Sequence, residues 1–110
     1  MSTKAAKAIE YIEKKRADII AVSDAVWRFA EVGLQEYQSS KCLAEALEKE
    51  GFTVELGVAG LPTAFVATWG RGKPVVGFLG EYDALPGLSQ KAVPFREELE
   101  KGKAGHGCGH

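Results

Sequence analysis

The stretch "PVVGFLGEYDALPG" (Pro74–Gly87) decides how this sequence is interpreted. Its first seven residues, Pro74–Gly80, are nearly all apolar and do not alternate with polar residues, which is typical of a strand covered on both faces of a sheet. Two carboxylates, Glu81 and Asp83, follow directly and lead into a turn with proline and glycine. In open α/β sheets, ligands bind at the carboxyl ends of strands. The stretch therefore predicts a buried strand ending at a functional rim, although a plain polar turn would also fit the pattern.

Two helices are predicted before this stretch. Within residues 3–30, Ile12, Ile19 and Val26 are spaced seven apart, with charged residues on the other face, so an amphipathic helix should pack there against a core. The apolar positions of Tyr37–Glu50 predict a second helix, followed by Gly51 in the left-handed conformation that often ends helices. Cys42, in this second helix, is interpreted as a small core residue.

The apolar period changes to two after the second helix. Phe52–Leu56 alternates as a half-buried strand, and Thr63–Trp69 predicts a second strand bounded by proline and glycine. Gly70–Lys73 predicts a tight connection into the apolar strand. The fold class is therefore α/β, with two helices followed by three strands. Farther on, Lys91–Lys103 is polar and predicts a surface excursion with a short helical turn around residues 96–101.

Composition excludes several classes of function. The 110 residues carry 14 basic and 15 acidic side chains without a basic stripe, which argues against nucleic acid or an anionic membrane surface as the main partner. No apolar run approaches the ~20 residues that span a bilayer. The charged N-terminal stretch is unlike a secretory signal, and the two cysteines have unrelated surroundings. We expect a cytoplasmic protein with reduced thiols.

The second informative stretch is "GHGCGH" (Gly105–His110), in which His106, Cys108 and His110 alternate with glycines. Thiolate and imidazole bind borderline divalent ions, and alternation lets Cys108 and His110 project the same way from an extended segment. The carboxylates after the apolar strand could add to such a site. An adventitious site and a frayed end stay open as alternatives, because a structural zinc site normally has four ligands at CxxC-like spacing.

Together, "GEYDALPGLSQ" and "GHGCGH" closely resemble the amidohydrolase branch of the dinuclear-metal aminoacylase and carboxypeptidase family. The resemblance extends through "FTVELGVAGLPTAFVATWGRGKPVVGFLGEYDALPGLSQ" and "WRFAEVGLQEYQSS", and so covers nearly all of the chain. It implies a catalytic domain with a mixed sheet between helices and two divalent ions at the sheet's rim. A smaller domain later in the sequence usually mediates dimerisation in this family.

The resemblance also implies roles for individual residues. Cys108 and His110 match two metal ligands of the family motif, with zinc or manganese as the metal. Asp83 matches an acid near the metal and is expected to orient a ligand. Glu81 and His106 match neighbouring motif positions and are candidates for groups beside the metal.

The activity that the resemblance implies is hydrolysis of an N-acyl glutamate amide of the aminobenzoyl type, or of a peptide-like substrate, by metal-activated water and a glutamate base. Family members are several hundred residues long. Residues 1–110 would then be the N-terminal segment of the catalytic domain, inactive alone, without the general base, the other ligands and the dimerisation domain. The intact enzyme would form a homodimer or bind a partner subunit. The alternative is a non-catalytic α/β fragment that binds a metal or a subunit.

A segment of this kind should associate with another chain. If the rest of the domain is absent, the apolar side chains around Val75, Val76 and Phe78 lose their cover. Exposed sheet edges and apolar patches seek partners. We therefore expect self-association, or dependence on a complementary chain.

Overall fold

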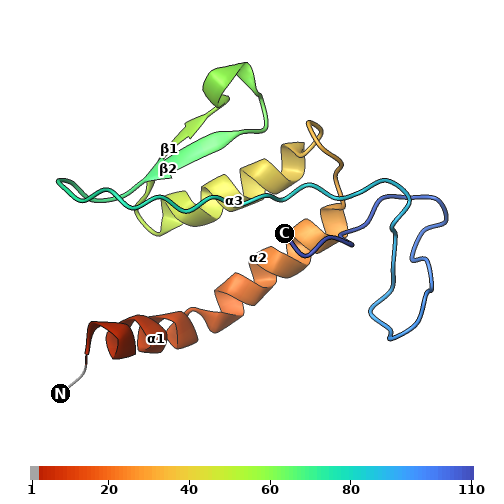
Figure 1. Cartoon of the computed structure of the whole chain (residues 1–110), viewed down its shortest axis with the longest axis horizontal. Helices are drawn as coiled ribbons and strands as arrows, with labels where there is room; N and C mark the ends of the chain where they lie inside the picture. Colours follow the sequence, from red (N-terminus) through yellow and green to blue (C-terminus); the bar gives the residue numbers. More distant parts are fainter. Residues whose placement is uncertain (1–2) are drawn as a thin grey trace.

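The structure, a computed structural model, describes residues 3–110 of the chain. Three helices are followed by a two-stranded hairpin and by long extended segments that return to the helices (Figure 1). The elements are α1 (Lys4–Lys14), α2 (Arg16–Phe29), α3 (Tyr37–Lys49), β1 (Thr53–Leu56), the short 3-10 helix η1 (Val58–Gly60) and β2 (Phe65–Thr68).

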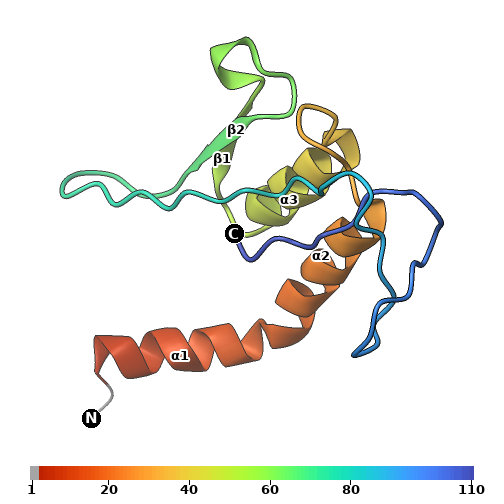
Figure 2. The same ribbon diagram turned by 45° about the vertical axis from the view of Figure 1, so that its right-hand side comes forward.

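The first predicted helix is divided in two. Lys15, with φ −93° and ψ 2°, separates α1 from α2, and Figure 2 shows α1 bent away from α2 at this point. The Lys15 ammonium lies 2.7 Å from a carboxylate oxygen of Glu50, which also accepts a hydrogen bond from the Tyr11 hydroxyl. The prediction of one continuous helix was therefore wrong. The break has no proline or glycine that would mark it in the sequence, and it is accompanied by contacts with Glu50 at the end of α3.

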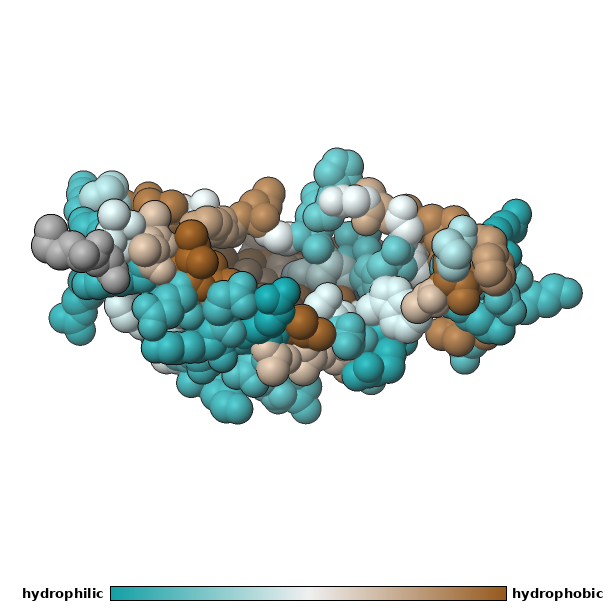
Figure 3. Space-filling model, turned by 90° about the horizontal axis from the view of Figure 1, so that it is seen from below, coloured by the Kyte–Doolittle hydropathy of each residue, from teal (hydrophilic) through white to brown (hydrophobic). Residues whose placement is uncertain are grey.

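The apolar face of α1 is not packed against a core, contrary to the prediction. Neither α1 nor α2 has a buried residue, and Ile9 and Ile12 are 62% and 55% exposed. An open groove of about 710 Å³ lies between these helices, α3 and Trp69. Figure 3 shows apolar side chains reaching the surface around a hollow on one face of the molecule.

The second helix was predicted correctly. α3 ends one residue before the predicted boundary, and Gly51 follows with φ +94° while its N–H donates to the carbonyl of Glu48. Ala44 of α3 is buried, and Cys42 is partly buried. Cys42 is therefore less buried than the core residue that the sequence predicted.

The hairpin confirms the first two predicted strands. β1 and β2 are antiparallel, and Val54 pairs with Ala67 while Leu56 pairs with Phe65. Both strands are shorter than the apolar runs that predicted them. The glycines of the predicted tight connection, Gly70 and Gly72, have φ of +83° and +88°, as a turn requires.

The third predicted strand does not form. We call Pro74–Gly80 the open segment: it runs extended across α3 in Figure 1, but within residues 3–110 it makes no backbone hydrogen bond. Phe78 and Leu79 are 95% and 96% exposed, so neither face is covered. The prediction of a buried strand was wrong here because a strand needs a neighbouring strand, which no other described segment supplies.

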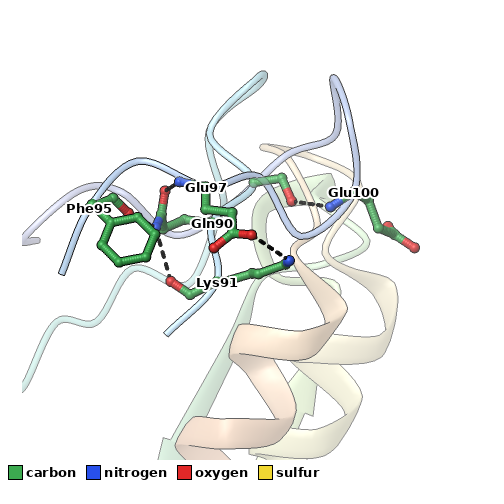
Figure 4. Close-up of polar contacts among 6 residues, drawn as sticks. Gln90, Lys91, Phe95, Glu97 and Glu100 are labelled. Atoms are coloured by element: carbon green, nitrogen blue, oxygen red, sulfur yellow. Dashed lines mark hydrogen bonds and ion pairs between the residues drawn. The ribbon is translucent and has the colours of Figure 1, made fainter. Parts of the chain in front are cut away.

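The polar excursion after the open segment contains no helical turn, so that expectation was also wrong. Instead, the Gln90 side chain donates to the carbonyls of Lys91 and Phe95 and accepts from the amide of Glu97 (Figure 4). Lys91 and Glu97 form an ion pair at 2.8 Å. A side chain that binds nearby backbone groups competes with the helical hydrogen bonds of those groups.

The chain has little interior. Among the described residues the buried apolar side chains are Ala44 and Ala84. The radius of gyration is 16.4 Å, whereas a compact domain of this length has about 13 Å. The fold class is confirmed at the level of helices with a small sheet. No helix in the described part is both long and apolar enough to cross a membrane.

Candidate functional site

The acidic stretch after the open segment is hydrogen-bonded to the connection between α2 and α3. The amide of Ala84 donates to the carbonyl of Glu31 at 2.7 Å, and Ala84 and Val32 form an isolated parallel bridge. Tyr82 donates its hydroxyl proton to the carbonyl of Thr63. Because residues on both sides of Asp83 are held in this way, the backbone at this carboxylate has a defined position.

A buried carboxylate supports these contacts. Glu36 is 8% exposed; one of its oxygens accepts from the Thr63 hydroxyl at 2.5 Å and the other from the Leu34 amide at 2.7 Å. Burial, followed by the charge of Glu36, raises the pKa of Tyr82 above its ordinary value of 10.0. The phenol therefore stays protonated and remains a donor at neutral pH.

Glu31 holds the first turn of α3. Its two carboxylate oxygens accept from the amides of Gln38 at 3.0 Å and Ser39 at 2.7 Å. Burial tends to raise the pKa of Glu31, but these backbone hydrogen bonds outweigh it and lower the pKa below 4.5. Sequence reasoning missed this residue. The signal was an acid shortly before a helix, where free amides and the helix dipole favour negative charge.

The terminal motif is joined to the acidic turn by two backbone hydrogen bonds. Leu85 and Gly105 exchange both bonds, at 3.0 and 3.1 Å. A Cβ atom added to Gly105 would overlap the carbonyl oxygen of Leu88, so only glycine fits here.

Cys108 and His110 lie side by side beyond this bridge. The Cys108 Sγ is 3.1 Å from the His110 Nδ1, and both side chains are exposed. Sulfur and nitrogen ligands on one tetrahedral zinc ion, at their usual bond lengths, lie about 3.5 Å apart. The pair therefore has the right donors and nearly the right separation to share an ion.

The other candidate residues are not part of this pair. His106 is turned toward α2, where its Nε2 lies 3.1 Å from the carbonyl of Val26. Glu81 and Asp83 are exposed and have no ion pair among residues 3–110. The described residues contain no group of three or more histidine, cysteine, aspartate or glutamate side chains that could hold a metal ion. Of the five candidate residues, the structure thus brings only Cys108 and His110 together.

Relatives of this chain share a hydrolytic activity. It is 46% identical over 100 residues to a subunit of the p-aminobenzoyl-glutamate hydrolase of Escherichia coli K12, a match that covers 90% of this chain and 21% of the relative. It is 34% identical to thermostable carboxypeptidase 1 of Saccharolobus solfataricus, a match that covers 93% of this chain and 28% of the relative. It is 30% identical to the Xaa-Arg dipeptidase of Homo sapiens, where the match covers 94% of this chain and 23% of the relative. The chain is a homologue of these hydrolases. No family model matches it.

The predicted resemblance to the amidohydrolases and carboxypeptidases is thereby confirmed. This hydrolase homologue spans between about a fifth and 28% of the length of the relatives named above. The small sheet and the scarce interior agree with a segment that is a minor part of such a protein. The comparisons show homology to these hydrolases over most of this chain.

Proposed function

We propose that this chain is the part of a metal-dependent amidohydrolase that supplies Cys108 and His110 as metal ligands. The observation that carries the proposal is the 3.1 Å separation of the Cys108 Sγ and the His110 Nδ1. The identity of 46% to a p-aminobenzoyl-glutamate hydrolase subunit supports an N-acyl glutamate amide of the aminobenzoyl type as the substrate of the whole enzyme. The carboxypeptidase and dipeptidase relatives support the wider class of peptide-like amides.

The donor set suits zinc or manganese. A thiolate and an imidazole favour borderline ions over magnesium or calcium, which prefer oxygen. A bound divalent ion would supply Lewis-acid chemistry, polarising an amide carbonyl and lowering the pKa of a water molecule. Within this chain, the Cys108 sulfur and a His110 ring nitrogen would hold the ion, and the flanking glycines would let both side chains reach it.

Asp83 is proposed to orient a ligand of the metal. Its support is the fastening of the neighbouring residues Tyr82 and Ala84, which restricts where the carboxylate can move. A carboxylate that accepts from a ligating imidazole fixes its ring orientation. Glu81 and His106 are proposed as further groups around the site, and a rotation of His106 away from the Val26 carbonyl would be needed.

The chain alone is proposed to bind metal weakly and to be inactive. Two ligands leave at least half of a tetrahedral site to solvent. Both side chains are exposed and must be ordered when the ion binds, which reduces affinity. In the whole enzyme, the general base and the remaining ligands would come from outside these 110 residues.

The whole enzyme is proposed to be a multi-subunit protein that acts on small molecules. The relative from Escherichia coli is one subunit of its hydrolase, which supports a whole enzyme that works as a homodimer or with a partner subunit. The absence of a basic stripe among 14 basic and 15 acidic residues supports small-molecule substrates over nucleic acid. A cytoplasmic location stays a prediction from the sequence.

Isothermal calorimetry with zinc tests the ligand assignment. The wild-type chain should bind zinc weakly, with an affinity that falls as the pH is lowered, because protons compete for the thiolate and the imidazole. Cys108→Ala and His110→Ala should each abolish measurable binding, and Cys42→Ala, which removes the other cysteine, should leave it unchanged. Tight binding that survives Cys108→Ala would place the metal on other residues.

A glutamate-release assay tests the catalytic part. With aminobenzoyl-glutamate and zinc or manganese, the 110-residue chain should release no glutamate above the uncatalysed rate. Turnover by this chain that Cys108→Ala abolishes would contradict the proposal that other segments supply essential groups. Turnover unaffected by Cys108→Ala would contradict the ligand assignment itself.

A further inference from the structure

The terminal motif is held in place at its first residues. Gly105 is buried and exchanges two backbone hydrogen bonds with Leu85. His106 is partly buried, and the chain is exposed from Gly107 to His110. The attachment of the motif therefore ends just before the two proposed metal ligands.

His106 joins the motif to a second element, the last turn of α2. Its Nε2 lies 3.1 Å from the carbonyl oxygen of Val26, which also accepts from the Ala30 amide at 3.2 Å. Because a carbonyl oxygen only accepts, this hydrogen bond requires the proton on Nε2. Carbonyls in the last turn of a helix carry partial negative charge and favour such a donor. Figures 1 and 2 show the terminal segment beside this end of α2.

We infer that His106 is a positioning residue for the proposed metal site: its hydrogen bond to α2 fixes the backbone from which Cys108 and His110 reach the ion. One residue, Gly107, separates His106 from Cys108. The inference rests on the proposed function, because it concerns the ion that this pair would hold. It keeps the imidazole on α2, so the rotation that would bring the ring beside the ion does not occur.

The structure separates this role from that of a third ligand. The described residues contain no group of three or more metal-binding side chains, so the His106 ring is not gathered with Cys108 and His110. Its Nε2 is occupied by the Val26 carbonyl. The ring therefore acts on the pair through the backbone and not through the ion.

A fixed His106 reduces the disorder that must be lost when the ion binds. Glycine on either side of Cys108 gives this backbone wide conformational freedom. With His106 held, the residues that remain to be ordered are those from Gly107 onward. Without the bond to α2, His106 must be ordered as well, and fixing one more residue lowers the metal affinity roughly tenfold. The two hydrogen bonds to Leu85 persist, so part of this loss is avoided.

Cobalt titration of the 110-residue chain tests the inference. Cobalt(II) accepts the same nitrogen and sulfur ligands as zinc, and its bond to a thiolate gives a charge-transfer absorption. His106→Leu removes the donor and keeps a side chain that can pack; it should lower the cobalt affinity about fivefold to tenfold. His106→Gln, whose amide NH₂ group can donate to the Val26 carbonyl, should bind within about twofold of wild type. The absorption at saturation should be the same for all three chains.

Two results of this titration overturn the inference. One is an unchanged cobalt affinity in His106→Leu, since the bond to α2 would then contribute nothing to the site. The other is an equal loss of affinity in both variants with an altered absorption at saturation, because the imidazole would then bind the ion itself.

Nuclear magnetic resonance of the metal-free chain separates this inference from the proposed function. Nitrogen relaxation should show larger motion of the Cys108 amide in His106→Leu than in wild type or His106→Gln. If wild type binds no cobalt, or if binding survives Cys108→Ala, the assignment of the ligands fails, while the relaxation data still decide whether His106 orders the motif. Equal mobility in all three chains overturns the inference even where the ligand assignment holds.

Discussion

Replacing Glu31 by glutamine should destabilise the chain by about 2 kcal/mol. The carboxylate accepts from two backbone amides at the start of α3, at 2.7 and 3.0 Å. Hydrogen bonds to charged groups contribute about 1.5–3 kcal/mol each, and the loss of a helix cap costs about 0.5–2 kcal/mol. Glutamine keeps one acceptor oxygen but turns an NH₂ group toward the second amide. One bond and the favourable charge at the helix N-terminus are therefore lost.

The measurement is urea unfolding followed by circular dichroism at 222 nm, with Glu48→Gln as the matched control. Glu48 is exposed on the same helix and has no side-chain hydrogen bond or ion pair within residues 3–110. With an m value of about 1–2 kcal/mol/M, the unfolding midpoint of Glu31→Gln should fall by roughly 1–2 M. The control should unfold with the wild type.

The pH dependence gives a second readout. The folded pKa of Glu31 lies below 4.5, so its contribution is fully present above the unfolded pKa and is lost as the pH falls through the folded pKa. The difference in unfolding free energy between wild type and Glu31→Gln should thus be full at pH 7 and shrink below about pH 4.5. Equal stabilities at pH 7, or a difference that grows in acid, would refute the assignment of Glu31 as the cap of α3.

Two further predictions concern the bridges around the site. Gly105→Ala should destabilise the two hydrogen bonds to Leu85, because the added Cβ overlaps the Leu88 carbonyl. Hydrogen exchange at the Leu85 amide should then become faster. The control Gly109→Ala, which has open space around the added Cβ, should not change that exchange rate. Tyr82, whose pKa is raised by burial and by a nearby carboxylate, should ionise above pH 10 in a 295 nm titration. Its contribution to stability is present below the unfolded pKa and is lost as the pH rises through the folded pKa. Tyr82→Phe should remove the late phase of that titration.

The sequence predicted the elements that local patterns determine. The hairpin and α3 have clear periods, and Gly51, Gly70 and Gly72 take the positive φ values that their positions require. These features depend on a few neighbouring residues. The division of the first helix at Lys15 could not be predicted, because the groups that tie down the break, above all Glu50, lie far away in the sequence.

The open segment illustrates the opposite limit. Its apolar sequence predicted a strand covered on both faces. No described part of this chain covers these side chains or pairs with this backbone, so the prediction of a buried strand failed. The candidate site divides in the same way. Cys108 and His110 are two residues apart in the sequence, and their side chains lie together. The other three candidates, Glu81, Asp83 and His106, would come close to this pair only through tertiary packing that the described residues lack.

The bridge between Leu85 and Gly105 has a consequence for how such chains can vary. Its two hydrogen bonds close a loop at the base, and the amide of Ser89 donates to the carbonyl of Lys103 just inside it. Insertions or deletions between these anchors would lengthen or shorten only the loop, because loop-closure entropy changes slowly with length. The acidic turn and the donor pair would keep their spacing. The excursion is therefore the place where an engineer could graft a foreign peptide without disturbing the residues on either side.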